Sequence, residues 1–352
     1  MATDVSQLGY STFTDIMANY SSLDAGAKFV MPKRILDRMT PLVKMMPMKA
    51  SNNILSNIAV RTDSLPVASN RRWNEGIKAT TSKNTPLNDP IALFQDVSEV
   101  DYDLWGLQND PEAWRMDQDM NHIEALFQLL ESTLFYGSTQ YNPGAFNGLS
   151  TRFNNLESYP NGDTSGVFLP NVWNGGLTTG PATSAWMIEF ADDTVYGIYP
   201  PNTSAGLKVE DMGKELKTLA STTGSQGANY YYPVLRTWLT WYMGIQIADE
   251  RAVQRIANIN PVALSSPGDF DENIFIQAKN NLPRNGEGSG TVIFVNRQLK
   301  AQIDIRAVSQ KINAYTNFNS NETDVFGRSV TKFQNIPIYV AEKILSTETV
   351  VS

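Results

Sequence analysis

The sequence predicts an α+β protein, in which long strands and a long helix come first and a smaller alternating unit follows. Three observations carry this prediction. A polar stretch lies between two strand-like segments, an amphipathic helix of about seven turns follows, and the C-terminal quarter alternates helices with short apolar strands. The chain has 352 residues, of which 41% are hydrophobic and 18% charged, and this composition is enough to fill a core.

Residues 1–53 are predicted to form an arm rather than a domain with its own core. They are rich in Met, Asn and Ser, and Pro41 and Pro47 prevent their short helical pieces from merging into one helix. The part from 28 to 49 is basic. Its charged residues are Lys28, Lys33, Arg34, Asp37, Arg38, Lys44 and Lys49. We expect such an arm to lie on something else rather than to fold by itself.

Residues 54–104 are predicted to form an extended hairpin with a protruding tip. The alternating segments NILSNIAVRT and IALFQDVSEVDYDL flank the polar stretch RTDSLPVASNRRWNEGIKATTSK, which covers residues 61–83. A surface loop of this length is usually functional or disordered. A two-stranded hairpin also has no core of its own and is marginally stable in water. We therefore expect this hairpin to gain its order from a partner.

A long helix is predicted within 110–137. Asp110 is placed to cap its N-terminus, Pro111 suits its first position, and Gly137 suits its C-terminal end. Apolar residues recur at spacings of three and four, which predicts a buried stripe. The stripe consists of Ala113, Met116, Met120, Ile123, Phe127, Leu130 and Leu134. A coiled coil would show the same spacing, and a long helix laid across a sheet fits it as well.

The rest of the chain divides into a sheet-containing domain that includes the helix, a small α/β unit and a tail. The predicted bounds are 105–262, 263–345 and 346–352. In the first of these we expect loops over 138–183, a hairpin over 184–200, a loop-rich piece around TTGSQGAN, and a long strand or strand pair over 230–259. The α/β unit is predicted to run helix, strand, helix and two final strands.

The sequence carries no recognisable catalytic, metal or cofactor motif. There is no Cys, and His122 is the single His, placed inside the long helix. The stretch NGEGSG (285–290) precedes a strand and lacks a following Lys-Ser or Lys-Thr, so it is interpreted as a turn. We predict no catalytic residue, no organic cofactor and no catalytic metal, while calcium or magnesium held by carboxylates stays open.

Charge and hydropathy narrow the class of protein further. The net charge of −8 argues against a chain that binds nucleic acid over its whole surface. No secretory signal is visible at the start, and the most apolar stretch, WLTWYMGIQIA, is too short to span a bilayer. Two rivals to a structural role remain. One is a hydrolase that uses a carboxylate pair, and the other is a phage tail or receptor-binding protein that recognises carbohydrate with its aromatic residues.

Opposite charges are placed in neighbouring stretches. Residues 61–83 hold five basic and two acidic residues, whereas residues 89–131 hold eleven acids and one basic residue. If each hairpin lies on a neighbouring copy of the chain, its basic residues can pair with the acidic residues of that neighbour. The predicted interface residues are Arg61, Arg71, Arg72, Trp73, Lys78 and Lys83 on the hairpin, and Asp117, Asp119 and Glu124 on the helix of the neighbour.

The order of these parts resembles the major capsid proteins of tailed double-stranded-DNA phages, which have the Hong Kong 97-like fold. In that family the parts are an N-terminal arm, an extended loop (the E-loop), a spine helix, a peripheral sheet domain and an axial α/β domain. The stretches FNGLSTRF, DDTVYGIYPPNTSAGLKVEDMG and WYMGIQIADERAVQRIANI look especially like capsid proteins of short-tailed phages. In this chain the axial-type unit comes last, so the resemblance implies a permuted connection.

The resemblance also implies a function and partners. It implies self-assembly into pentamers and hexamers of an icosahedral shell, in the host cytoplasm during assembly and then in the virion. A separate scaffolding protein, a portal and a decoration protein are implied as partners, with no membrane. Packaged DNA is expected to be contacted only weakly, because the chain is acidic overall.

Overall fold

The computed structural model describes residues 41–156, 171–219, 230–262, 270–284, 286, 290–314 and 332–352. Most of the predicted arm and of the NGEGSG turn lies outside these residues. The chain divides into two compact units. The first holds Leu93–Leu129 and Gly206–Trp241, and the second holds Thr40–Ala92, Leu130–Ala205 and Tyr242–Ser352.

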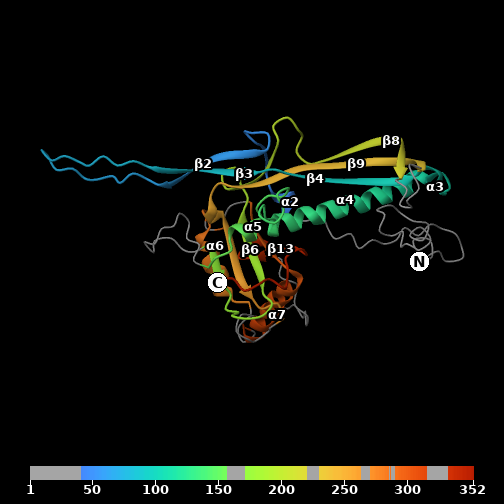
Figure 1. Cartoon of the computed structure of the whole chain (residues 1–352). Helices are drawn as coiled ribbons and strands as arrows, with labels where there is room; N and C mark the ends of the chain where they lie inside the picture. The colour runs from blue at the N-terminus through green and yellow to red at the C-terminus, as the bar shows by residue number, and fades with distance from the viewer. Residues whose placement is uncertain are drawn as a thin grey trace. The chain divides into compact units, whose positions relative to one another are not determined.

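The elements follow one another along the chain in the order below, and Figure 1 labels many of them. The strands are β1 (Met48–Ala50), β2 (Ser56–Ser64), β3 (Lys83–Pro90), β4 (Ala92–Asp101), β5 (Val172–Asn174), β6 (Thr183–Glu189), β7 (Val195–Tyr199), β8 (Leu207–Leu219), β9 (Tyr230–Ile247), β10 (Val253–Ile259), β11 (Thr291–Val295), β12 (Lys332–Phe333) and β13 (Ile336–Val340). The helices are α2 (Pro41–Met45), α3 (Tyr102–Gly106), α4 (Pro111–Tyr136), α5 (Leu149–Arg152), α6 (Glu272–Asn281) and α7 (Arg297–Ala314), with a 3-10 turn, η3, at Glu250–Ala252.

The first unit is a sheet of long strands with a helix along it. β9 lies between β4 and β8, and β8 pairs with it in antiparallel fashion from Leu207 opposite Trp241 to Leu219 opposite Tyr230. Figure 1 shows the first part of α4 running in the direction of these strands. Phe127 of the helix packs edge-on against Trp241, with ring centroids 4.9 Å apart. A smaller apolar cluster consists of Val100, Leu104, Trp105 and Trp114.

The second unit is built on a six-stranded sheet in the order β12-β13-β11-β6-β10-β5. α6 and α7 cover one of its faces, where Phe275 and Leu299 pack among buried strand residues such as Met187 and Ile293. The opposite face is aromatic. There Phe135, in the last turn of α4, lies 6.3 Å from the ring of Trp186 and 6.4 Å from that of Phe294.

Close backbone contacts require glycine in this unit. The amide N–H of Phe190 donates to the carbonyl of Gly290 at 3.1 Å. A Cβ atom at Gly290 would lie 2.0 Å from the carbonyl oxygen of Phe190. A Cβ atom at Gly137, directly after α4, would likewise lie 2.4 Å from the carbonyl oxygen of Phe146. These two positions therefore exclude any side chain without a backbone shift.

Several predicted elements are confirmed. α4 matches the predicted helix, and the side chain of Asp110 accepts a hydrogen bond from the N–H of Ala113 at 3.2 Å, as an N-terminal cap does. β9 and β10 match the predicted strand pair, and α6, β11, α7, β12 and β13 follow the predicted order of the α/β unit.

Three predictions are wrong. The return strand of the hairpin is β3, which pairs with β2 along its length, whereas β4 belongs to the sheet of β9. Residues 184–200 do not form a hairpin, because β6 pairs with β10 and β11 while β7 pairs with β1 and β9. Residues 183–189 and 253–259, predicted for the peripheral sheet, are consequently paired within the sheet of the α/β unit.

The helical stripe is also only partly right. Leu130 and Leu134 are fully buried, but Met116 is 69% exposed. Trp114, which is not part of the predicted stripe, is buried instead and packs with Val100 in the first unit. β8 was not predicted as a strand, because its charged residues interrupt the apolar alternation.

Candidate subunit interface

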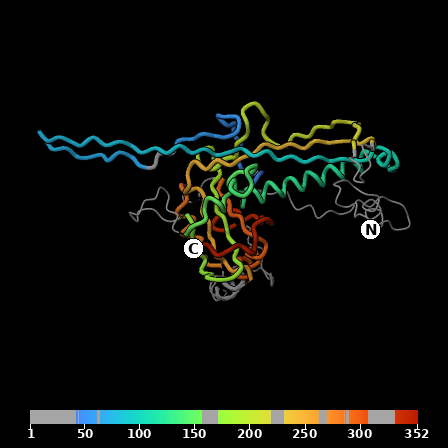
Figure 2. The backbone as a smooth tube through the Cα atoms, in the orientation of Figure 1, coloured from blue at the N-terminus to red at the C-terminus, as the bar shows by residue number. Residues whose placement is uncertain are grey.

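The hairpin formed by β2 and β3 continues well beyond its paired strands. Figure 2 shows the two sides running on together to a distant tip. The hydroxyl of Thr80 donates to the carbonyl of Val67 at 3.2 Å, which joins the two sides. At the tip, the N–H of Glu75 donates to the carbonyl of Arg72 at 3.2 Å, and Asn74 has a positive φ of 67°. A β-turn with Asn in the left-handed region thus closes the hairpin and presents Trp73.

The base of the hairpin is held by buried polar contacts. The side-chain amide of Asn57 donates to the side chain of Gln246 at 3.1 Å, and both residues are buried. Arg152 forms an ion pair of 2.7 Å with the buried carboxylate of Asp89. A Cβ atom at Gly244 would lie 2.6 Å from the carbonyl oxygen of Pro90, so β9 passes very close to the end of β3. The base of the hairpin, which we call its root, is therefore held in place by contacts with the rest of the second unit.

Large apolar side chains are exposed along the hairpin. They are Ile54, Leu55, Ile58, Val60, Leu65, Val67, Trp73 and Ile77. Trp73, at the tip, is 92% exposed. Burial of apolar surface stabilises by about 25 cal/mol per Å², and a contiguous exposed apolar surface marks an interaction site. This row was missed in the sequence, although Leu65, Val67 and Ile77 stand in the stretch that we described as polar.

The predicted basic residues lie on the same hairpin. Arg71, Arg72, Lys78 and Lys83 are all exposed. Arg61 lies in β2, opposite Thr85 of β3. The basic charges and the exposed apolar side chains therefore share one projecting element.

The predicted acidic residues lie on α4 and are half-buried. The carboxylate of Asp119 accepts a hydrogen bond from the hydroxyl of Thr237 at 3.1 Å, within the first unit. Glu124 accepts one from the side chain of Gln128 at 3.3 Å, one turn further along the helix. Part of the hydrogen-bonding capacity of these acids is therefore used inside the subunit. Met116 and Leu129 of the same helix are exposed, although Met116 was predicted to lie in the buried stripe.

An ion network joins the three strands of the first unit. Arg236 of β9 contacts Glu99 of β4 at 2.7 Å and Glu215 of β8 at 2.5 Å, and Lys217 of β8 also pairs with Glu99. The Glu99 side chain is 14% exposed. A half-buried acid with two cationic partners holds the outer strands against the central one.

We expect the stability of the subunit to fall in acid through Glu99. Burial alone would raise the pKa of Glu99, but hydrogen bonds from Lys217 and Arg236 outweigh burial and lower it. A carboxyl with a lowered folded-state pKa stabilises the fold fully above its unfolded-state pKa, about 4.3 for Glu. That stabilisation is lost as the pH falls from there through the folded-state pKa.

Urea unfolding of the parent and of Glu99→Gln, followed from about pH 7 to about pH 3, checks this expectation. The variant should be less stable near neutrality, and the difference should shrink in acid. Two stability curves that stay parallel over this range would contradict the role given to Glu99.

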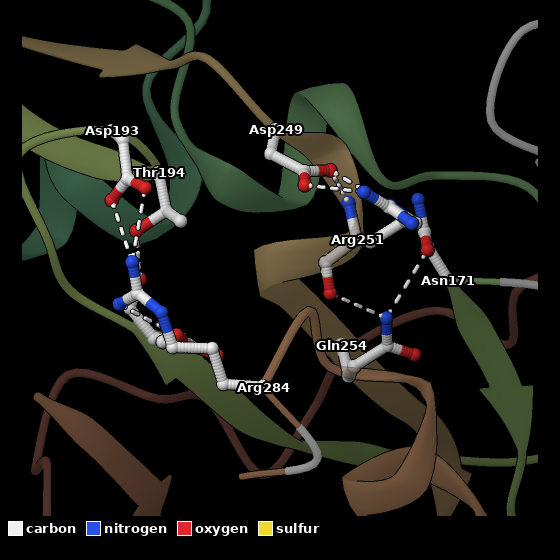
Figure 3. Close-up of polar contacts among 8 residues, drawn as sticks. Asn171, Asp193, Thr194, Asp249, Arg251, Gln254 and Arg284 are labelled. Carbon is white, nitrogen blue, oxygen red and sulfur yellow. Dashed lines mark hydrogen bonds and ion pairs between the residues drawn. The ribbon is translucent and has the colours of Figure 1, made fainter. Parts of the chain in front are cut away.

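Other polar clusters have structural roles. His122 lies 2.8 Å from Asp96 in the first unit, on the side of α4. Figure 3 shows Arg284 bound to Asp193, and Arg251 bound to Asp249. The described residues contain no cluster of three or more metal-ligating side chains. Among them, no helix is long and apolar enough to cross a membrane.

The buried Gln254 of Figure 3 illustrates this structural use of polarity. Its amide nitrogen donates to the side chain of Asn171 at 3.1 Å and to the carbonyl of Arg251 at 2.8 Å. Its amide oxygen accepts from the indole N–H of Trp173 at 2.8 Å and from Asn281 at 3.2 Å. A side chain with its donors and acceptor satisfied in this way fixes the packing of its neighbours.

A comparison with solved structures finds a similar fold in a bacteriophage structure. The chain matches the cryo-EM structure of bacteriophage Epsilon15 with a TM-score of 0.68 and 18% identity, over 97% of each chain. A bacteriophage JBD30 capsid matches with a TM-score of 0.47 and 12% identity, over 93% of this chain and 98% of that one. A JBD30 capsid described as decorated with minor capsid protein trimers matches at 0.43 and 10%, over 94% and 99%. A comparison with curated proteins finds no match.

The fold is therefore that of the Hong Kong 97-like capsid proteins, a class of structural shell subunits. The sequence places the chain within this class, because the family model described as Major capsid protein GP7 matches residues 31–352. The chain belongs to that family. It is a non-enzymatic protein of the virion capsid, where it forms the icosahedral shell of a phage.

Proposed function

We propose that the hairpin is the element by which one subunit holds the next in the shell. The observation that carries this proposal is the row of exposed apolar side chains, with Trp73 at its end, on an element that has no core of its own. Arg71 and Arg72 directly precede Trp73 in the chain, Lys78 follows the turn, and all three are exposed too. An aromatic anchor flanked by arginines is typical of the residues that dominate protein interfaces.

The proposed surface on the neighbouring subunit is its α4, around Asp117, Asp119 and Glu124. Opposite charges favour this placement, although each exposed ion pair contributes only about 0–1 kcal/mol. The exposed Met116 and Leu129 support it, because they offer apolar surface on the same helix. Repetition of one such contact around a ring yields a closed assembly.

The finer assignments extend this proposal. In it, residues 1–53 act as the arm, 54–104 contain the extended loop and 110–137 the spine helix. The peripheral domain lies within 105–262, and the axial domain contains 263–345 together with β6 and β10, whose strands pair in the same sheet, in a permuted order. The shell is of the short-tailed-phage type and is built from pentamers and hexamers. A scaffolding protein, a portal and a decoration protein act as partners. The resemblance of the sequence to short-tailed-phage capsid proteins supports these assignments.

Replacement of the tip tests the role of the hairpin. A variant in which residues 65–82 are replaced by Asn-Gly retains β2, β3 and the buried root, since a two-residue turn of this kind closes a hairpin. We expect folded subunits that form no shells in electron micrographs and sediment as small species. Normal shells from this variant would overturn the proposal.

The inner surface of the shell is expected to bind DNA only weakly, because the chain carries a net charge of −8. Purified empty shells mixed with short duplex DNA at physiological salt check this by co-sedimentation. Retention of DNA that persists as the salt is raised would contradict the expectation.

A further inference from the structure

Residues 345–352 lie on the second unit in the way that a bound peptide lies on its receptor. Glu348 forms two backbone hydrogen bonds with Ala182, of 2.9 and 3.0 Å, as one rung of an antiparallel ladder. The side-chain amide of Asn258 accepts from the N–H of Val351 at 2.8 Å and donates to its carbonyl at 2.9 Å. Backbone pairing and a bidentate amide thus hold the segment at two points.

The start of the segment is held as well. The N–H of Leu345 donates to the hydroxyl of Tyr136 at 2.9 Å, and its carbonyl accepts from the hydroxyl of Thr183 at 2.9 Å. Tyr136 also donates to the carboxylate of Glu348. Burial and the neighbouring Glu348 charge raise the pKa of this hydroxyl, so it remains a donor.

The carboxylate of Glu348 forms an ion pair with the buried guanidinium of Arg255. Arg255, on β10, has a side chain that is 3% exposed, and its Nη2 lies 2.9 Å from Glu348 Oε2. The other guanidinium nitrogens donate to Ser184 at 3.0 Å and to the carbonyl of Phe153 at 2.6 Å. The guanidinium also lies 5.0 Å from the ring centroid of Trp186.

This arrangement makes the core depend on the segment. An arginine stays protonated even when it is buried, and Ser184 and the Phe153 carbonyl are neutral. Among the ion pairs of the described residues, the carboxylate that faces Arg255 is Glu348. Removal of one member of a buried pair leaves an uncompensated charge, which is strongly destabilising. The sheet strand that carries Arg255 therefore needs a carboxylate from outside the sheet.

We propose that residues 345–352 are a docking segment that completes the charge of the second unit, so that this unit is stable only while the segment is bound to it. The receptor surface is formed by Tyr136, Ala182, Ser184, Arg255 and Asn258, and the ligand is a short extended peptide with one carboxylate at the position of Glu348. The segment thus stabilises the second unit before assembly begins and independently of the hairpin.

The first test uses the full chain as unassembled subunits. Glu348→Gln keeps the shape of the side chain but removes its charge, and we expect its melting temperature to fall by roughly 5–15 °C. The matched control is Glu342→Gln, which removes an acid paired with Arg297, whose side chain is 78% exposed. It should melt within about 2 °C of the parent. A Glu348→Gln subunit as stable as this control would overturn the proposal.

The second test separates the segment from the rest of the chain. A protease site inserted between Lys343 and Ile344 allows the folded subunit to be cut after it has formed. We expect the released peptide to stay bound through gel filtration, and to be lost when the same subunit carries Glu348→Gln. A synthetic peptide of residues 344–352 should then restore the melting temperature of the emptied subunit in a concentration-dependent way.

Two results of the cleavage experiment would count against the proposal. One is loss of the peptide from the cut parent subunit, and the other is equal retention of the parent peptide and the peptide that carries Glu348→Gln. Both readouts are made on subunits outside any shell. A failure here is therefore distinct from a failure of the hairpin to join neighbouring subunits.

Discussion

Subunits in which Arg71 and Arg72 are both replaced by Glu are expected to fold normally and to fail in assembly. Both side chains are exposed at the tip, so their replacement costs the isolated subunit little stability. In the shell, the change would turn an attraction for an acidic neighbour into a repulsion at every copy of the contact. A single pair contributes about 0–1 kcal/mol, but repetition over a closed shell multiplies it.

Circular dichroism and electron microscopy of the same preparation check this expectation. The spectrum should match that of the parent, while shells should be absent or should fall apart at moderate salt. A matched double variant reverses two exposed arginines of α7, Arg297 and Arg306, with the same change in net charge. It should assemble. Salt-resistant shells from Arg71→Glu/Arg72→Glu would show that the hairpin is held by something other than charge.

A methyl group at Gly290 is expected to destabilise the second unit more than most surface changes do. The Cβ atom would lie 2.0 Å from the backbone carbonyl oxygen of Phe190, so β11 and the end of β6 would have to move apart. Overpacking of this kind costs about 1–3 kcal/mol, and a clash with backbone belongs at the upper end. Gly290→Ala should therefore lower the free energy of unfolding by about 3 kcal/mol.

The control variant for this change is expected to raise the free energy of unfolding instead of lowering it. Gly106, at the end of α3, has open space around the position of its Cβ atom. Gly106→Ala should stabilise the subunit by about 0.4–1 kcal/mol, because it reduces the freedom of the unfolded chain. Urea unfolding of the two variants measures both effects. Equal stabilities would mean that β6 and β11 separate at no cost.

Local signals allowed much of the fold to be predicted. The caps and spacing of α4 are contained in twenty-odd consecutive residues, so they can be recognised without tertiary information. The pairing of the strands cannot be recognised from local sequence in this way. β6 and β7 are separated by a tight Asp192-Asp193 turn that is typical of a hairpin, yet each joins a different sheet. Which strand completes a sheet depends on burial on both faces, and the turn does not record it.

At the candidate interface, too, some features can be predicted from the local sequence and others depend on the tertiary structure. The basic residues of the hairpin could be named as candidates because charge can be read directly from the sequence. The apolar row was not, because Leu65, Val67 and Ile77 are spaced among polar residues and reveal their exposure only when the backbone is extended. The engagement of Asp119 with Thr237 also depends on β9, which lies more than a hundred positions further along the chain.

Pro86 and Pro90 of β3, opposite Val60 and Ser56 of β2, have a consequence for the time before a shell forms. An exposed hairpin strand normally offers a row of free N–H and C=O groups that a like strand can extend into a fibril. Proline has no N–H to offer and is tolerated in a paired strand where its nitrogen points outward. Two of the eight positions of β3 therefore have no N–H group that could bond to an added strand. These prolines therefore lower the tendency of exposed hairpins on separate subunits to pair edge to edge before they contact their neighbours in the shell.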